Sequence, residues 1–143
     1  MAIQAVSVIG LGKLGCPMAA CYAAKGYRVI GVDADAGRRE AVRTGAVPGR
    51  EPGLPELLAR TTDRVMVTDD VEAAVRESDL TFLIVPTPTG PAGGFVLTHV
   101  LAACRQIGAA LRQKQGFHVV ALSSTVMPGA TGSSRPSAAR GAS

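Results

Sequence analysis

The chain has 143 residues and a net charge of +4, and 47% of its residues are hydrophobic but only 3% aromatic. This length suits one domain, and a core made of Ala, Val, Leu and Ile favours a buried parallel sheet with helices on its faces. The sequence lacks a basic run, stacking aromatic residues, an apolar run of membrane-span length and a recognisable signal peptide, so we expect no nucleic-acid or membrane partner and predict a cytoplasmic location.

Short apolar segments alternate with helix-like segments along most of the sequence. Strands are predicted for residues 5–10, 27–33, 64–68, 79–86 and 117–124. Helices are predicted for residues 13–25, 36–44, 54–60, 70–77 and 96–115, with Asp69 as the capping residue of the fourth. This alternation predicts an α/β fold of the Rossmann type, a doubly wound parallel sheet of about five strands in the order 3-2-1-4-5.

The pattern ends near Gly129, where the sequence becomes rich in Gly, Ser, Ala and Arg without a periodic apolar face. Such a composition is typical of disordered segments. We therefore predict a dinucleotide-binding domain over residues 1–131 and a disordered tail over residues 132–143. The sheet would be cut off after its fifth strand, leaving residues 117–124 as an open edge that invites self-association.

Gly10, Gly12 and Gly15 form a G-x-G-x-x-G motif between the first predicted strand and the first predicted helix. In a dinucleotide-binding fold the first glycine permits a tight turn, and the second lets the pyrophosphate approach the backbone. The third lets the helix pack closely against the strand. The phosphates then lie at a helix N-terminus, where the helix dipole favours negative charge.

Asp33 ends the next predicted strand. A carboxylate at this position accepts hydrogen bonds from the adenosine ribose and repels a 2′-phosphate, so the motif predicts NAD as the cofactor in preference to NADP. Arg38 and Arg39 follow it, and an arginine can pair with that phosphate. From the sequence alone, both arginines are expected on the solvated face of the following helix.

Four later segments occur in a fixed order: EPGLPELL (51–58), TTD (61–63), VPTP (85–88) and SSTVMPGAT (123–131). Together with the glycine motif, over roughly residues 3–131, they resemble the N-terminal NAD-binding domain of the UDP-glucose/GDP-mannose dehydrogenase family. The resemblance implies an enzyme that oxidises the C6 alcohol of a nucleotide sugar to a carboxylate with two NAD molecules. It also implies that Leu14 lines the cofactor loop, that Asp33 and Arg38 contact the adenosine ribose, and that Thr87 and Thr125 lie beside the cofactor.

The sequence departs from the family pattern in two places. Val96 stands where the family has an Asp that opens a helix, so an N-cap acceptor is lost, and His99 is expected on the helix surface without a catalytic role. The region that carries the nucleophilic Cys in the family, and the sugar-nucleotide domain, do not follow in this sequence. We expect Cys16, Cys21 and Cys104 to be small buried helix residues, and we predict no catalytic residue and no metal site.

These departures predict the NAD-binding first domain of a nucleotide-sugar 6-dehydrogenase, inactive alone, because oxidation of the aldehyde needs a thiolate and groups that stabilise the developing oxyanion. A nucleotide sugar would be a substrate of the full-length enzyme only. Locally, Thr87 also fits a turn between prolines, and Thr125 fits a strand-end hydroxyl. Two alternatives remain: a stand-alone NAD-binding module for regulation or assembly, and the N-terminal domain of a 3-hydroxyisobutyrate-type dehydrogenase, against which the GREPGLPELL and VPTP segments argue.

Overall fold

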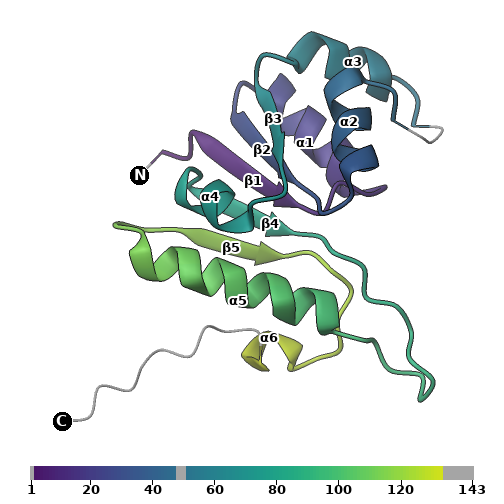
Figure 1. Cartoon of the computed structure of the whole chain (residues 1–143), viewed down its shortest axis with the longest axis vertical. Coiled ribbons are helices and arrows are strands. Elements are labelled where there is room, and N and C mark those ends of the chain that lie inside the picture. Colours follow the sequence, from purple (N-terminus) through teal and green to yellow (C-terminus); the bar gives the residue numbers. More distant parts are fainter. Residues whose placement is uncertain (1, 48–50, 134–143) are drawn as a thin grey trace.

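The computed structural model describes residues 2–47 and 51–133. At its centre lies a five-stranded sheet in the order β3-β2-β1-β4-β5 (Figure 1), and every neighbouring pair of strands is parallel. The strands are β1 (Ala5–Ile9), β2 (Arg28–Val32), β3 (Val65–Thr68), β4 (Leu80–Leu83) and β5 (Val119–Leu122). The predicted doubly wound fold and its strand order are confirmed.

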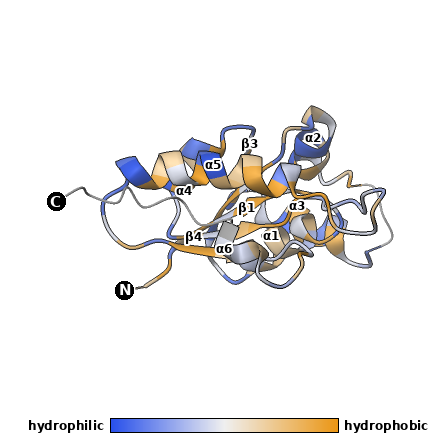
Figure 2. Ribbon diagram, turned by 90° about the horizontal axis from the view of Figure 1, so that it is seen from below, coloured by the Kyte–Doolittle hydropathy of each residue, from blue (hydrophilic) through white to orange (hydrophobic). Residues whose placement is uncertain are grey.

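Helices cover both faces of the sheet. They are α1 (Gly15–Ala24), α2 (Ala36–Thr44), α3 (Leu54–Thr61), α4 (Val71–Arg76), α5 (Thr98–Gln113) and α6 (Ala130–Ser133). Successive side chains of β1 point to opposite faces, so Val6 and Val8 pack in the cluster that includes α1 and α3, whereas Ile9 packs with α4 and α5. Figure 2 shows α4 and α5 on one side of the sheet and α1 on the other. Within the described ranges, no helix is both long and apolar enough to cross a membrane.

The start of α4 differs from the prediction by one residue. Asp70, not Asp69, is the N-cap, and its Oδ1 accepts a hydrogen bond from the backbone N–H of Ala73 at 2.9 Å. Asp69 lies instead 3.8 Å from the guanidinium of Arg39. Two adjacent aspartates made both assignments compatible with the sequence, and only the chain geometry separates them.

The long helix α5 begins two residues later than expected, at Thr98. Leu97 is at its N-cap, and no side chain caps it, in agreement with the loss of an acceptor at Val96. The backbone N–H of Val96 instead donates to the carbonyl of Pro88 at 2.8 Å, which holds this residue in the preceding turn.

At the other end of the chain, α6 forms one short helical segment that the sequence did not predict. The predicted tail of residues 132–143 lies outside the described part except for its first two residues. The domain boundary and the disorder of the tail therefore stay predictions.

A closed polar network lies between the sheet and the α4/α5 layer, near the amino ends of the strands. The hydroxyls of Ser7 and Thr81, which pair across β1 and β4, are 2.6 Å apart, and Ser78 Oγ donates to Ser7 Oγ at 3.0 Å. Thr81 Oγ1 lies 2.9 Å from His118 Nε2. The Lys114 ammonium donates to the backbone carbonyls of Val75, at 2.9 Å, and Ser78.

Burial governs the titration of this network. It lowers the pKa of Lys114, and together with the neighbouring Lys114 charge it lowers the pKa of His118. At its rim, Asp79 accepts hydrogen bonds from the backbone N–H groups of Ala5 and Gln4, and these bonds lower the pKa of the carboxyl. Within the described ranges, no buried side-chain nitrogen or oxygen lacks a partner.

Candidate cofactor site

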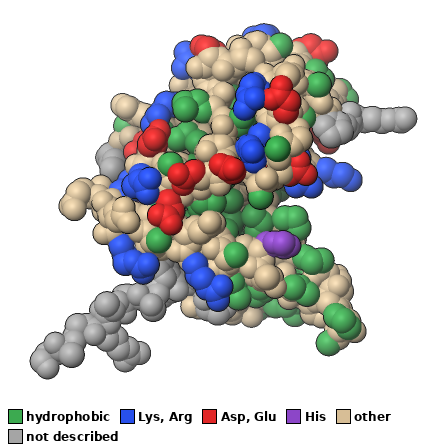
Figure 3. Space-filling model, in the orientation of Figure 1, with side chains coloured by type: hydrophobic (Ala, Val, Ile, Leu, Met, Phe, Trp, Pro, Cys, Tyr) green, Lys and Arg blue, Asp and Glu red, His purple; other side chains and the backbone are tan. Residues whose placement is uncertain are grey.

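A cavity of about 720 Å³ opens at the carboxyl ends of the central strands. Its walls come from the turn between β1 and α1, the end of β2 and start of α2, the start of α4, the segment after β4, and α5. In Figure 3 this face is hollowed between α2 and α5, and apolar side chains show in the hollow. The strand order reverses between β1 and β4, and such a switch point is where open α/β sheets bind ligands.

The three glycines of the motif serve two different purposes. A Cβ added to Gly15 would lie 1.7 Å from the carbonyl oxygen of Gly10, and one added to Gly10 would lie 1.9 Å from the carbonyl oxygen of Ile84. Gly10 also has φ of +102°, which favours glycine. At Gly12, by contrast, an added Cβ would meet nothing within 4 Å. Gly10 and Gly15 are thus needed for the chain to pack, whereas packing does not require a glycine at position 12. The predicted role of Gly12, to leave space for a pyrophosphate beside the N-terminus of α1, stays a prediction.

Asp33 is held by the backbone in a fixed position at the end of β2. Its side chain is 8% exposed, Oδ2 accepts from the N–H of Leu11 at 2.9 Å, and Oδ1 accepts from the N–H of Asp35 at 2.9 Å. An ionised carboxylate has about four acceptor sites, so the two backbone bonds leave acceptor capacity, which Asp33 shares with the Arg38 guanidinium 3.5 Å from Oδ2. The role of Asp33 in binding the adenosine ribose stays a prediction.

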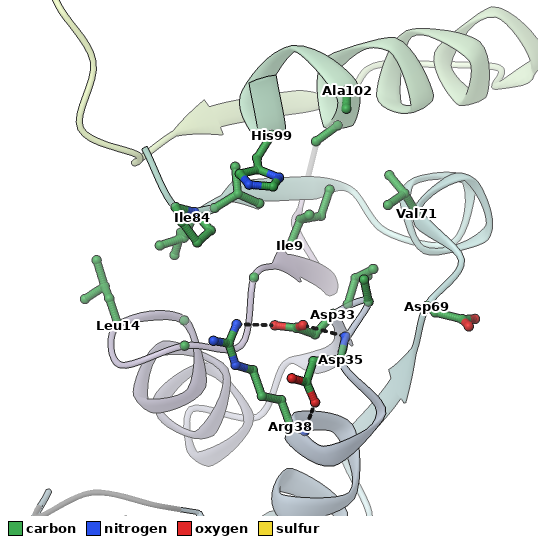
Figure 4. A pocket seen from close by; sticks show the side chains of 18 of the residues that line it. Ile9, Leu14, Asp33, Asp35, Arg38, Asp69, Val71, Ile84, His99 and Ala102 are labelled. Carbon is green, nitrogen blue, oxygen red and sulfur yellow. Dashed lines mark hydrogen bonds and ion pairs between the residues drawn. The ribbon is translucent and has the colours of Figure 1, made fainter. Parts of the chain in front are cut away.

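Arg38 is exposed, as expected, but the expectation that Arg39 lies on the solvated face of α2 is wrong. Arg38 lines the cavity with its guanidinium 3.5 Å from the Asp33 carboxylate. Arg39 donates to the backbone carbonyls of Asp33 and Ala34 at 2.8 and 3.1 Å, and only 19% of its side chain is exposed. Figure 4 shows the Arg38 guanidinium turned toward the Asp33 carboxylate, whose charge attracts it.

Most of the predicted cofactor residues meet around this cavity: Gly10, Gly12, Leu14, Gly15, Asp33 and Arg38. Thr87 and Thr125 follow β4 and β5 at the same edge of the sheet but are not among its lining residues, so their roles stay predictions. The sequence analysis also missed Ser124, which directly precedes Thr125. Its hydroxyl accepts from the N–H of Val85 at 2.9 Å and donates to the Val85 carbonyl at 2.9 Å, which ties the two strand ends together.

One face of α5 covers the cavity, and the sequence analysis missed this as well. Its lining residues are His99, Ala102, Ala103 and Gln106. Their spacing places them on one side of a helix, but no motif marks them. His99 is exposed, as expected, yet its ring lies over the cavity rather than away from it (Figure 4).

The three cysteines have different environments. Cys16 is buried, as predicted, and burial raises its pKa. Cys21 is exposed and Cys104 is half-buried, so the expectation that all three are buried is wrong. Helix α1 presents both a sheet-facing and a solvent-facing side, and Cys21 is on the latter. No cysteine lines the described part of the cavity.

The parallel sheet, the glycine turn and the anchored acid define a dinucleotide-binding domain of the doubly wound class. The sequence model of the UDP-glucose/GDP-mannose dehydrogenase family, NAD binding domain, matches residues 4–141, and the chain belongs to this family. Its cofactor is therefore NAD, as the residues at the end of β2 predict.

Among its relatives, the chain is 40% identical over 126 residues to a GDP-mannose 6-dehydrogenase of Pseudomonas aeruginosa, and 41% identical over 127 residues to a UDP-glucose 6-dehydrogenase of Rhizobium meliloti. These matches cover 87% of the chain but only 29% and 28% of the relatives. In structure it is similar to a ternary complex of the Pseudomonas aeruginosa GDP-mannose dehydrogenase, with a TM-score of 0.85, 38% identity and coverage of 89% of this chain and 30% of that one. A UDP-glucose dehydrogenase from Pyrobaculum islandicum has a TM-score of 0.83 at 38% identity, with coverage of 90% and 30%.

Proposed function

We propose that this chain supplies the NAD-binding part of a nucleotide-sugar 6-dehydrogenase, which oxidises the C6 alcohol of a sugar such as GDP-mannose or UDP-glucose to a carboxylate. The observation that carries the proposal is the cavity itself, where Gly12 leaves space for a pyrophosphate and the backbone presents Asp33 as a ribose acceptor. The names of the relatives supply the substrate class. The cytoplasmic location expected from the sequence belongs to this proposal.

Each part of the cavity has a proposed task. The Asp33 carboxylate accepts hydrogen bonds from the adenosine ribose, and Arg38 lies beside it. The turn at Gly12 and Leu14 holds the pyrophosphate at the N-terminus of α1. Thr87 and Thr125 flank the nicotinamide end. When bound, NAD supplies the hydride acceptor, and the chain positions it.

We propose further that this chain alone binds NAD without catalysing turnover. Oxidation of an aldehyde to a carboxylate by this chemistry requires a thiolate that adds to the carbonyl, so that the adduct can release a hydride. Within the described residues no thiol lines the cavity, and Cys16 is buried with a raised pKa. The described residues therefore offer a cofactor site without a thiol nucleophile beside it.

Two measurements test this function. Calorimetric titration should show that NAD binds, and that NADP binds more weakly because its 2′-phosphate meets Asp33. A preference for NADP would overturn the cofactor assignment. Incubation of the pure chain with NAD and GDP-mannose or UDP-glucose should yield no NADH, and sustained NADH formation would show that the nucleophile has been overlooked. If the chain binds NAD but acts only as a regulatory partner of another protein, this result would favour the alternative of a stand-alone NAD-binding module.

The sheet margin at β5 suggests a second kind of partner, another copy of the chain. β5 lies at the end of the strand order, and near it Phe117 is 65% and Val120 40% exposed. Apolar strand edges of this kind invite pairing between chains. The purified chain should self-associate in light scattering, and Val120→Lys should reduce the association, whereas a monomer at all concentrations would contradict this part of the proposal.

A further inference from the structure

The lining of the cavity changes character from one end to the other. At one end Asp33, Asp35 and Arg38 gather around the carboxyl end of β2 and the start of α2 (Figure 4), and Asp69 follows the neighbouring strand β3. At the other end the segment that follows β4 contributes only apolar lining residues: Ile84, Val85 and Pro86. If the Asp33 end receives the adenosine ribose, the apolar end receives the nicotinamide half of the cofactor.

His99 is placed at this second end. It lies in the first turn of α5, which begins at Thr98, and Figure 4 shows its ring beside Ile84, on the far side of the cavity from the glycine turn that carries Leu14. Away from the Asp33 end, the polar lining side chains of the described chain are Lys13, His99 and Gln106. Lys13 belongs to the glycine turn itself, and Gln106 lies about two helical turns farther along α5.

The glycine turn can bind only one side of a pyrophosphate. Backbone N–H groups at the N-terminus of α1 would bind the phosphate oxygens on the side of this turn, and α5 lines the cavity opposite it. A donor on that helix would satisfy the phosphate oxygens that the turn does not bind, and the carboxylates that would compete for such a donor are grouped at the opposite end of the cavity (Figure 4). A ring N–H of histidine is a suitable donor for a phosphate or a ribose oxygen.

We propose that His99 is a cofactor-binding residue, whose imidazole donates a hydrogen bond to the phosphate or the ribose of the nicotinamide half. This inference rests on the proposed binding of NAD in the cavity. It assigns a role to a residue that the sequence placed on the helix surface, and it gives the cofactor a contact from α5 opposite the glycine turn. The cofactor would then be held from two layers of the domain rather than from the turn alone.

The test compares three ligands that share one end. NAD, ADP-ribose, which lacks the nicotinamide ring, and AMP, which lacks the second phosphate and ribose, are titrated calorimetrically against the whole chain. His99→Ala should weaken NAD and ADP-ribose binding to the same extent, roughly three- to tenfold, and leave AMP binding unchanged. His99→Gln, which retains an N–H donor, should recover part of the loss. Arg105→Ala, an exposed change on the same helix outside the cavity lining, is the matched control and should bind all three ligands as the unaltered chain does.

Every other result overturns the inference. Unchanged NAD affinity in His99→Ala would show that the ring does not contact the cofactor. Equal losses for NAD and AMP would place its effect at the adenosine end or in the fold, and a loss confined to NAD would place it at the nicotinamide ring. Failure of the unaltered chain to bind NAD would instead contradict the proposed function, so the two failures are distinguishable.

Discussion

The polar side chains at the two ends of the parallel sheet differ in how completely the protein satisfies their hydrogen bonds. At the amino ends of the strands, Ser7, Ser78, Thr81 and His118 bond to one another, and this network is closed by protein partners. At the carboxyl ends, Asp33 is also anchored by the protein, but it retains acceptor sites toward an open cavity. A polar group whose hydrogen-bonding partners all lie in the protein contributes to stability. A polar group with unused donor or acceptor sites can also contribute to binding.

The largest expected effects are at the glycine turn, where one glycine should affect stability and another should affect NAD binding. Gly15→Ala should destabilise the fold by about 3 kcal/mol, the upper end of the usual cost of overpacking, because the new Cβ would collide with the backbone carbonyl of Gly10. Gly12→Ala adds the same methyl group to open space. It should change the free energy of unfolding by less than about 1 kcal/mol and lower NAD affinity at least about tenfold. Urea unfolding and calorimetric titration measure the two effects, and equal destabilisation by both variants would contradict the assignment of Gly12 to the ligand.

Asp33 is the exception to this division between stability and binding, because we expect its one side chain to contribute to both. Asp33→Ala removes the acceptor for two backbone N–H groups, of Leu11 and Asp35, and should cost about 1–3 kcal/mol of stability. It should also weaken NAD binding about tenfold and NADP binding less, since the repulsion of the 2′-phosphate disappears with the carboxylate. The ratio of the two dissociation constants is the decisive measurement. A ratio that does not narrow would remove Asp33 from the cofactor site.

The closed network offers the converse test. Thr81→Val keeps the shape of a fully buried side chain but leaves Ser7 and His118 without one partner each. The expected loss is about 1–3 kcal/mol of unfolding free energy, with unchanged NAD affinity. Thr62→Val, at an exposed position, is the matched control and should be nearly neutral. If Thr81→Val is fully folded and still binds NAD more weakly, the polar network and the cofactor cavity at the two ends of the sheet are coupled.

The smallest expected effect is on pH dependence. The pKa of His118 is lowered in the fold by burial and by Lys114, despite the nearby Asp79 carboxylate. Below the ordinary imidazole pKa of about 6.5, the unfolded chain therefore takes up a proton that the folded chain resists, and stability falls as the pH is lowered. One proton corresponds to at most about 1.4 kcal/mol per pH unit, and less here because His118 is only half-buried.

His118→Gln provides the comparison for this effect, because Gln retains a donor and an acceptor but does not titrate. Urea unfolding at a series of pH values below neutrality should give a flatter curve for the variant than for the unaltered chain. Parallel curves would show that His118 is as free to accept a proton in the folded chain as in the unfolded chain.

The sequence predicted the layers of this fold well, because its signals are local and mutually consistent. The helix over Ala36–Thr44 has exactly the predicted bounds, with Gly45 following it in a left-handed conformation. Alternation of strands and helices left few topologies, and the confirmed strand order follows from that restriction. The glycine motif and the acid at the end of the second strand predicted four of the residues around the cavity, and the family resemblance added Leu14 and Arg38.

The features that the sequence analysis did not predict share a physical cause, because each depends on which side chain contacts which partner in the folded chain. Asp69 and Asp70 are equivalent as capping residues in sequence, and the geometry of the turn selected Asp70. The bonds between Ser7 and Ser78 and between His118 and Thr81 join residues that are 71 and 37 positions apart, which no local pattern reveals. His99 was missed for a similar reason, since a helix position shows which residues share its face but not what lies opposite.

The double hydrogen bond of Ser124 has a mechanical consequence. Because one hydroxyl bonds both the N–H and the carbonyl of Val85, the segments that leave β4 and β5 cannot slide past each other without breaking two bonds at once. Thr87 and Thr125 lie two and one residues beyond these bonds, so we expect the bonds to limit how far the two threonines can move apart. A binding site that the protein already holds together loses less conformational entropy when its ligand arrives.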